Sequence, residues 1–131
     1  MIAKGASGRG DHLTLYRRPH LLVAHGEGSV REGLAGILER AGYDVDEAGN
    51  SDVALVILNQ GNVDTLVVNS RLPPNRCGAL LERCHGPLPT VVLGESPDDV
   101  EGLGADRRVK SVLMRPFKLQ ALYDAVARAT N

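Results

Sequence analysis

Short apolar runs alternate with longer mixed segments from residue 21 to the end of the chain, and this pattern predicts alternating strands and helices. Five runs are predicted to be strands: residues 21–24, 44–48, 65–69, 90–93 and 111–114. Three of them are continuously apolar, as expected of strands that are covered on both faces. The run at residues 44–48 alternates instead, which favours a strand at the edge of the sheet.

The segments between these runs have the spacing of amphipathic helices. In the first segment, the apolar residues of one face are Val30, Leu34, Ile37, Leu38 and Ala41. We expect Ser29 to cap this helix and Gly42 to end it. The next helix is expected to begin at a Ser51 cap and to stop at Gly61. The remaining helices are predicted at residues 77–84, at about 97–103 and at 119–130.

Strands that alternate with helices are expected to pair in parallel, because parallel strands need a crossover connection and a helix supplies it. The right-handed crossover rule leaves few windings. We predict a single α/β domain with a doubly wound, flavodoxin-like (βα)5 fold and a parallel five-stranded sheet in the order 2-1-3-4-5. In such a sheet the ligand crevice lies beyond the carboxyl ends of the first and third strands. Residues 25–28 (HGEG) would then lie beside residues 69–74 (NSRLPP).

The domain is predicted to span residues 20–131, after a leader at residues 1–19. The leader mixes glycine and serine with basic residues and has no sustained periodicity, so we expect a flexible basic segment. An apolar content of 43% is enough for the core of one domain. No apolar run is long enough to span a bilayer, and we expect a cytoplasmic protein with no membrane partner.

Charge and cysteine content narrow the possible functions. Lys plus Arg number 15 and Asp plus Glu number 16, so this domain is not expected to bind nucleic acid directly. Cys77 and Cys84 would lie about 10 Å apart along one helix, which is too far for a disulfide, and no second ligand pair completes a zinc site. We expect reduced thiols that act as buried apolar groups rather than as sensors.

Glycine, proline and polar residues follow the predicted strands in a characteristic arrangement. The stretches are VAHGEGSVREGL at the first strand, NSRLP at the third, PTVVLGE at the fourth and LMRPFKLQAL at the fifth. Their spacing across residues 21–130 resembles the receiver domain of two-component response regulators. The resemblance implies adjacent acidic residues that hold magnesium, an aspartate that is phosphorylated, a Ser or Thr after the fourth strand, and a Lys followed by a cis proline. Pro116, in the RPF motif, is therefore the expected cis proline.

The residues at the positions of this chemistry depart from the family pattern. The acidic pair corresponds to His25 and Gly26, the phosphoacceptor to Asn69, the switch residues to Gly94 and Val112, and the lysine to Arg115.

Each departure has a chemical consequence. The neutral amide of Asn69 is not a nucleophile that could form an acyl phosphate. His25 and Gly26 provide no carboxylate for magnesium, and Glu27 alone would make a poor site. Arg115 keeps the positive charge, but a planar guanidinium does not replace a compact ammonium. We therefore predict a pseudo-receiver that is not an enzyme, has no cofactor, and binds magnesium weakly or not at all.

The favoured hypothesis is an atypical receiver-like signalling module of a two-component or related pathway that acts by phosphorylation-independent protein–protein interaction. Receiver domains contact partners through their fourth helix, fifth strand and fifth helix, so the resemblance implies a protein partner or a homodimer at that face. The candidate residues there are Arg107, Arg108, Lys110, Tyr123 and Asp124.

Two alternatives stay open. The first is a small-anion or nucleotide sensor, because glycines at a helix start expose backbone N–H groups that bind anions. The residues of this altered pocket are His25, Gly26, Gly28 and Arg115. The second is a working phospho-receiver in which Asp46, Glu47 or Asp64 replaces Asn69, although Asp64 precedes its strand and would lie at the opposite end of the sheet.

Three of these residues also have simple structural interpretations. His25 would be a partly exposed loop histidine, and Asn69 would be a structural hydrogen-bonding residue. Gly94 would mark a site of close backbone approach.

Overall fold

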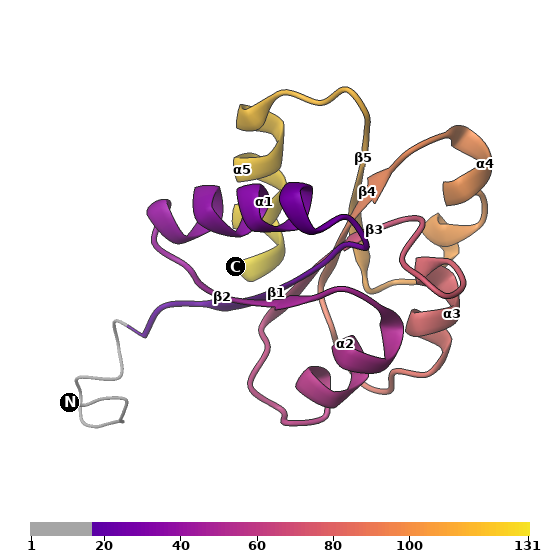
Figure 1. The fold of residues 1–131 in the computed structure, drawn as a ribbon, viewed down its shortest axis with the longest axis horizontal. Coiled ribbons are helices and arrows are strands. Elements are labelled where there is room, and N and C mark those ends of the chain that lie inside the picture. Colours follow the sequence, from indigo (N-terminus) through magenta and orange to yellow (C-terminus); the bar gives the residue numbers. More distant parts are fainter. Residues whose placement is uncertain (1–16) are drawn as a thin grey trace.

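The fold is a five-stranded parallel sheet between two layers of helices (Figure 1). The computed structural model describes residues 17–131. The strands are β1 (His20–Ala24), β2 (Asp44–Ala48), β3 (Thr65–Asn69), β4 (Thr90–Gly94) and β5 (Val109–Met114). They lie in the order β2-β1-β3-β4-β5, which confirms the predicted topology.

Helices connect each strand to the next, as parallel pairing requires. They are α1 (Gly28–Arg40), α2 (Ser51–Leu58), α3 (Cys77–Glu82), α4 (Pro97–Val100) and α5 (Leu119–Thr130), with a 3-10 turn, η3 (Leu103–Ala105), after α4. Helices α1 and α5 cover one face of the sheet, and α2 and α3 cover the other (Figure 1). No helix within residues 17–131 is long and apolar enough to cross a membrane.

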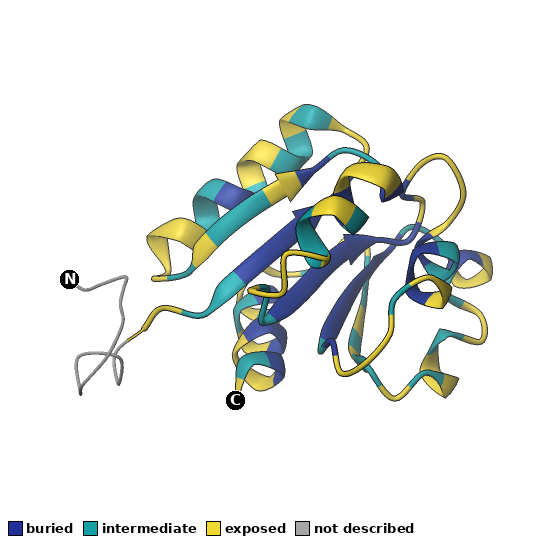
Figure 2. Cartoon of the chain, turned by 90° about the horizontal axis from the view of Figure 1, so that it is seen from below, coloured by how far each residue is buried: buried dark blue, intermediate teal, exposed yellow. Residues whose placement is uncertain are grey.

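Two apolar clusters, one on each face of the sheet, form the core. Along β1 the side chains alternate between them, so that Leu21 and Val23 pack toward α1 and α5 while Leu22 and Ala24 pack toward α2 and α3. Strands β3 and β4 are buried along their whole length (Figure 2). The continuous apolar runs therefore correctly predicted strands that are covered on both faces.

The helix caps differ from those predicted. Glu27, not Ser29, is the N-cap of α1, and its side chain makes no capping hydrogen bond. Asn50 caps α2, because its Oδ1 accepts from the backbone N–H of Val53 at 2.9 Å. Ser51 is instead the first residue of α2, and its buried hydroxyl has no hydrogen-bond partner in the structure. The predicted helix ends are confirmed by two glycines of positive φ, Gly42 at +106° and Gly61 at +84°.

Helix α4 is a single turn and ends earlier than predicted. It begins at Pro97 and stops at Val100, because Glu101 is extended and Gly102 has a φ of +83°. The face of β5 that looks toward α4 is consequently only partly covered. Val112, which pairs in register with Val92, is 37% exposed.

The edge strand β2 carries three acidic residues, and each has a basic partner. Asp44 lies 3.9 Å from Arg18, Asp46 lies 2.8 Å from His20, and Glu47 lies 3.1 Å from Arg31. The acidic atoms of these contacts are Asp44 Oδ1, Asp46 Oδ2 and Glu47 Oε1. Charged side chains on an edge strand discourage pairing with another chain.

Only the end of the predicted leader can be described. Residues 1–16 lie outside the described residues, and Arg17 bonds Asp64 Oδ1 at 2.9 Å. The backbone N–H of His20 donates to the other oxygen of Asp64 at 2.7 Å. Asp64 thus holds the chain where it enters β1.

Candidate functional site

Four polar side chains follow the carboxyl ends of the strands at the crevice that the topology predicts. His25 follows β1, Asn69 ends β3, Glu95 follows β4, and Arg115 follows β5. Three of them were expected from the sequence. Glu95 was not, although its place directly after a buried strand, in the stretch PTVVLGE, was the signal that could have found it.

The amide of Asn69 is fully engaged inside the protein. The residue is 4% exposed, and its Nδ2 donates to Glu95 Oε2 at 2.7 Å and to the backbone carbonyl of Leu93 at 3.4 Å. Its Oδ1 accepts from the backbone N–H of Arg71 at 3.0 Å. Both donors and the acceptor are therefore used, which agrees with the structural interpretation of this residue.

Glu95 connects Asn69 to Arg115. Its Oε1 and Oε2 lie 3.2 and 3.4 Å from Arg115 Nη1, and its own backbone N–H donates to Ser70 Oγ at 3.2 Å. The Glu95 side chain is 18% exposed, whereas that of Arg115 is 56% exposed. The cation predicted to face the crevice thus already has a carboxylate partner.

His25 is buried, at 7% exposure, and is not the partly exposed histidine that we expected. The reason is that the chain continues beside β2 for one more residue, because the backbone N–H of His25 donates to the Ala48 carbonyl at 3.0 Å. The His25 Nδ1 accepts from the backbone N–H of Glu27 at 3.0 Å. Burial lowers the pKa of His25, and the nearby charges of Glu95 and Glu27 oppose this only in part.

Packing closes two positions where the family has reactive side chains. A Cβ atom at Gly26 would lie 2.8 Å from Cδ of Pro73 and 2.9 Å from its Cγ. A Cβ atom at Gly94 would lie 2.6 Å from the sulfur of Met114 and 2.9 Å from Cγ1 of Val100. Neither an aspartate at 26 nor a hydroxyl residue at 94 could enter without displacing these neighbours. The expected close approach at Gly94 is present, but side chains rather than backbone make it.

The magnesium that the resemblance implies does not fit these residues. Glu27 is exposed at the start of α1, and the oxygens of Glu95 are held by Asn69 and Arg115. Within residues 17–131, no three His, Cys, Asp or Glu side chains gather closely enough to hold a metal ion. Pro116, the expected cis proline, does follow a cis peptide bond.

The alternative acceptors do not reach the crevice. Asp64 precedes β3 and lies beside the start of β1, where its backbone N–H donates to the His20 carbonyl at 2.7 Å. Asp46 is paired with His20, and Glu47 is paired with Arg31. None of the three contacts Asn69.

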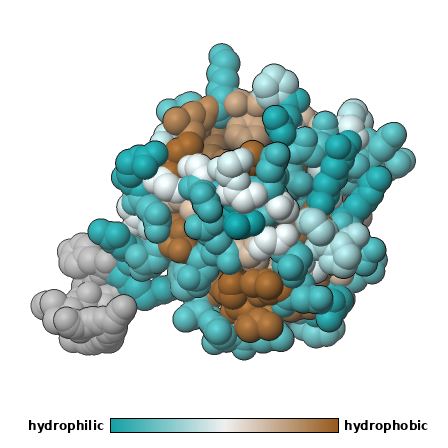
Figure 3. Space-filling model, in the orientation of Figure 1, coloured by the Kyte–Doolittle hydropathy of each residue, from teal (hydrophilic) through white to brown (hydrophobic). Residues whose placement is uncertain are grey.

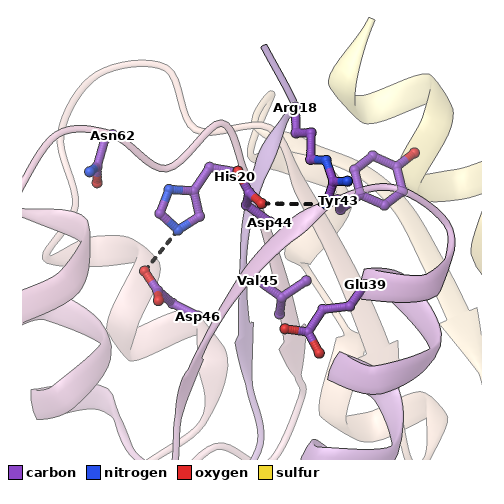
Figure 4. Close-up of a pocket in the computed structure, with 8 residues that line it drawn as sticks. All are labelled: Arg18, His20, Glu39, Tyr43, Asp44, Val45, Asp46 and Asn62. Carbon is purple, nitrogen blue, oxygen red and sulfur yellow. Dashed lines mark hydrogen bonds and ion pairs between the residues drawn. The ribbon is translucent and has the colours of Figure 1, made fainter. Parts of the chain in front are cut away.

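A second hollow, of about 550 Å³, lies at the amino ends of β1 and β2, away from the crevice (Figure 4). His20 and Asp46 pair on one side of it, and Arg18 and Asp44 pair on another. These four side chains thus pair with each other, and we assign no function to the hollow.

The predicted interaction face divides into internal and exposed residues. The Arg108 side chain is only 20% exposed and donates to the carbonyls of Leu81 and Cys84, at 2.8 and 3.0 Å, so it is an internal anchor rather than a surface contact. Tyr123 packs partly against the core. The candidates that remain exposed are Arg107, Lys110 and Asp124.

The exposed large apolar side chains of residues 17–131 lie on α2, β5 and α5. Leu119, at the start of α5, is 46% exposed, and Val112 on β5 is 37% exposed. On α2, Val53 and Val56 are 44% and 63% exposed, and Figure 3 shows hydrophobic surface over the region of this helix.

Comparisons with known proteins agree with this fold. No family model matches the chain. The curated DNA-binding transcriptional regulator NtrC of Bradyrhizobium sp. (strain RP501 Parasponia) is 28% identical over 113 residues, which cover 83% of this chain and 24% of NtrC. The chain therefore spans about a quarter of the length of this relative.

Solved structures give the same result. A CheY-like receiver domain protein from Methanospirillum hungatei superposes with a TM-score of 0.77 at 18% identity, over 87% of this chain and 94% of that one. NtrX from Brucella abortus superposes with a TM-score of 0.75 at 26% identity, over 87% of this chain and 27% of NtrX. The chain has the CheY-like α/β fold, and these similarities support a receiver domain of response regulators.

Proposed function

We propose that this domain is an atypical receiver module that signals through protein–protein interaction and does not depend on phosphorylation. The observation that carries the proposal is the contact between Asn69 and Glu95, in which a carboxylate lies 2.7 Å from the amide nitrogen at the acceptor position. An amide cannot form the acyl phosphate, and its neighbour is an anion.

Charge at the crevice also opposes a phosphoryl group. Two like charges 4 Å apart repel by about 4 kcal/mol at an effective dielectric constant near 20. A phosphoryl group at residue 69 would meet the Glu95 carboxylate at such a distance, without the magnesium that would neutralise it. The cation of Arg115 cannot offset this fully, because Glu95 is already its partner.

The packing around Gly26 and Gly94 supports the same proposal. The space that an acidic residue or a hydroxyl residue would need is filled by Pro73, Met114 and Val100. The chemistry of the family would therefore require changes in the neighbours as well as in the residues themselves.

An amide chemical-shift titration tests phosphorylation independence. The domain is titrated with magnesium, and then with magnesium plus beryllofluoride, which mimics an aspartyl phosphate. We expect no saturable shift at Gly26, Asn69 or Arg115. Saturable shifts at these residues that extend to α5 would contradict the proposal.

The proposed partner face comprises α4, β5 and α5, where the apolar side chains Leu119 and Val112 and the cations Arg107 and Lys110 are exposed. Sedimentation velocity over a range of concentrations tests whether a second copy binds there. We expect Leu119→Lys to weaken self-association, while Val56→Lys on the exposed side of α2 leaves it unchanged. The reverse result would assign the interface to α2, and a monomer at every concentration would leave a different protein as the partner.

A further inference from the structure

Asn69 and Arg115 present hydrogen-bond donors to one small volume between the ends of three strands. Because β4 lies between β3 and β5 in the sheet, the residue that follows β4 is placed between these two donors. That residue is Glu95. Its Oε2 accepts from Asn69 at 2.7 Å, and both of its oxygens lie within 3.4 Å of Arg115 Nη1.

We propose that Asn69 and Arg115 form a carboxylate-binding site whose resident ligand is the domain's own Glu95, so that a built-in anion holds the ends of β3, β4 and β5 in one arrangement. The inference deepens the proposed function and rests on it, since it concerns the same crevice. It assigns a ligand class, a carboxylate or a similar small oxyanion, and it implies that the site is filled without an added anion.

The backbone aims each member of the site. Asn69 is in register with Leu93 on β4, and the Arg115 N–H donates to the Gly94 carbonyl at 3.1 Å. The Glu95 N–H donates to the hydroxyl of Ser70, a residue with 0% exposure, at 3.2 Å. The three side chains thus start from fixed positions, and their contacts do not depend on a flexible loop.

Burial indicates that the carboxylate is a ligand and not a surface charge. The Glu95 side chain is 18% exposed and the Asn69 residue 4%, while the Arg115 side chain is 56% exposed. Charge-assisted hydrogen bonds are stronger than neutral ones, and partial burial reduces competition from water. Removing the Glu95 side chain would leave the amide of Asn69 and the charge of Arg115 unmatched around an open volume.

This arrangement permits a chemical rescue experiment. We would measure the thermal unfolding midpoint of Glu95→Ala in sodium chloride, sodium acetate and sodium phosphate at equal ionic strength. We expect the midpoint in chloride to fall by about 4 °C or more, because two charge-assisted bonds are lost. Acetate should restore part of the loss saturably, and phosphate should act similarly if the site accepts any small oxyanion.

Three controls make the result specific. Glu32→Ala removes an exposed glutamate of α1 and should show neither the loss nor the rescue. The wild type should not respond to acetate, because its site is filled. The double variant Glu95→Ala, Arg115→Ala should lose the rescue. If acetate stabilises Glu95→Ala and Glu32→Ala equally, or if Glu95→Ala is as stable as the wild type, the inference is wrong.

Glu95→Gln serves if Glu95→Ala does not fold. It keeps the shape and an oxygen that can accept from Asn69, but removes the charge that faces Arg115. We expect the Arg115 side-chain N–H signals to shift and to exchange faster with water than in the wild type. Unchanged Arg115 signals would overturn the inference.

The two proposals fail in different ways. Binding of beryllofluoride by the wild-type domain would contradict phosphorylation independence. If Glu95→Ala does not respond to acetate and the wild type does not respond to beryllofluoride, only the proposal of a resident carboxylate ligand is contradicted.

Discussion

At the scale of single residues, the side-chain nitrogen of Asn69 determines which neighbour position 69 can have. Its Nδ2 faces the Glu95 carboxylate at 2.7 Å, so an amide is tolerated there because it donates. A carboxylate in the same position could only accept. The residue therefore suits its neighbour, and an aspartate at position 69 would place two carboxylates side by side.

We predict that Asn69→Asp destabilises the domain by about 2 kcal/mol or more at neutral pH and does not restore phosphorylation. Two carboxylates at this range repel, with an upper magnitude of about 4 kcal/mol at 4 Å. The loss should shrink below about pH 4, where carboxyl groups bind protons. Urea unfolding at both pH values measures it, with Asn62→Asp, an exposed loop residue, as the control. A stability equal to the wild type at neutral pH would contradict the prediction.

The sequence was a better guide to which positions follow the strand ends than to the contacts that their side chains make. The spacing of the strand ends, matched to the receiver pattern, identified His25, Asn69 and Arg115. The burial of His25 and the role of Glu95 depend on side-chain directions between neighbouring strands. Spacing along one chain carries no information on those directions.

At the scale of elements, α2 shows how two adjacent polar residues can exchange roles. Asn50 and Ser51 are both good cap residues, and the sequence pattern placed the cap at Ser51. In the structure, the Ser51 N–H donates to the Pro73 carbonyl at 2.8 Å and its hydroxyl turns inward without a partner. Asn50 is the residue whose oxygen reaches the helix.

We predict that Asn50→Ala lowers the free energy of unfolding by about 1 kcal/mol, the usual cost of losing an N-cap. Ser51→Ala should be neutral or slightly stabilising, since it removes a buried hydroxyl that makes no hydrogen bond. Urea unfolding of both variants tests the pair. If Ser51→Ala is the more damaging substitution, the cap assignment is wrong.

Helix α4 depends on an ionic contact because a single turn is not stable alone. The Asp99 side chain is 2% exposed and lies 2.6 Å from Arg71 Nε and 2.5 Å from Arg76 Nη1. Burial by itself would raise the pKa of Asp99, but the hydrogen bond and charge of Arg71, together with Arg76, outweigh it and lower the pKa. This contact attaches α4 to the segment between β3 and α3.

We predict that Asp99→Asn loosens α4, so that amides of residues 97–105 exchange with deuterium faster while those of β1 and β3 are unchanged. Because the pKa of Asp99 is lowered in the folded state, its contribution is present above the usual Asp pKa and is lost as pH falls through the lowered value. The exposed neighbour in the variant Asp98→Asn is the control. Equal exchange in both variants would show that the contact does not hold α4.

At the scale of the whole molecule, the order of the sheet followed from periodicity and crossover handedness because both are global constraints on a chain of this kind. The continuously apolar runs predicted strands that are covered on both faces. Helix α5 was predicted with its observed bounds. The short α4 was harder to predict. Pro97 and Gly102 mark its limits, but only tertiary contacts stop it at Val100.

Arg108 shows why surface residues are difficult to assign before the fold is known. Its guanidinium donates to the carbonyl of Leu81 in the last turn of α3 and to that of Cys84 just after the helix, and it bonds Asp106 Oδ2 at 2.7 Å. It therefore joins α3 to the start of β5. Arg107, its neighbour in the sequence, is exposed.

We predict that Arg108→Ala lowers the free energy of unfolding by about 3 kcal/mol, because several hydrogen bonds to a charged group are lost. Arg107→Ala should remain within about 0.5 kcal/mol of the wild type, as is usual for exposed substitutions. Urea unfolding at pH 7 measures both. Equal losses of stability in the two variants would show that Arg108 is not an internal anchor.

The pH dependence of that loss provides an independent check on the same anchor. Hydrogen bonds from Arg108 lower the pKa of Asp106 to about 2, and those from its side chain have a larger effect than the one from its backbone N–H. A group with a lowered folded-state pKa stabilises the fold above its usual pKa, and this contribution disappears as pH falls toward 2. Arg108→Ala keeps the backbone N–H bond to Asp106 but loses the larger side-chain contribution. The stability gap between it and the wild type should therefore be constant above about pH 5 and narrow below about pH 4. A gap that stays constant on acidification would mean that Arg108 stabilises the domain through the Leu81 and Cys84 carbonyls alone.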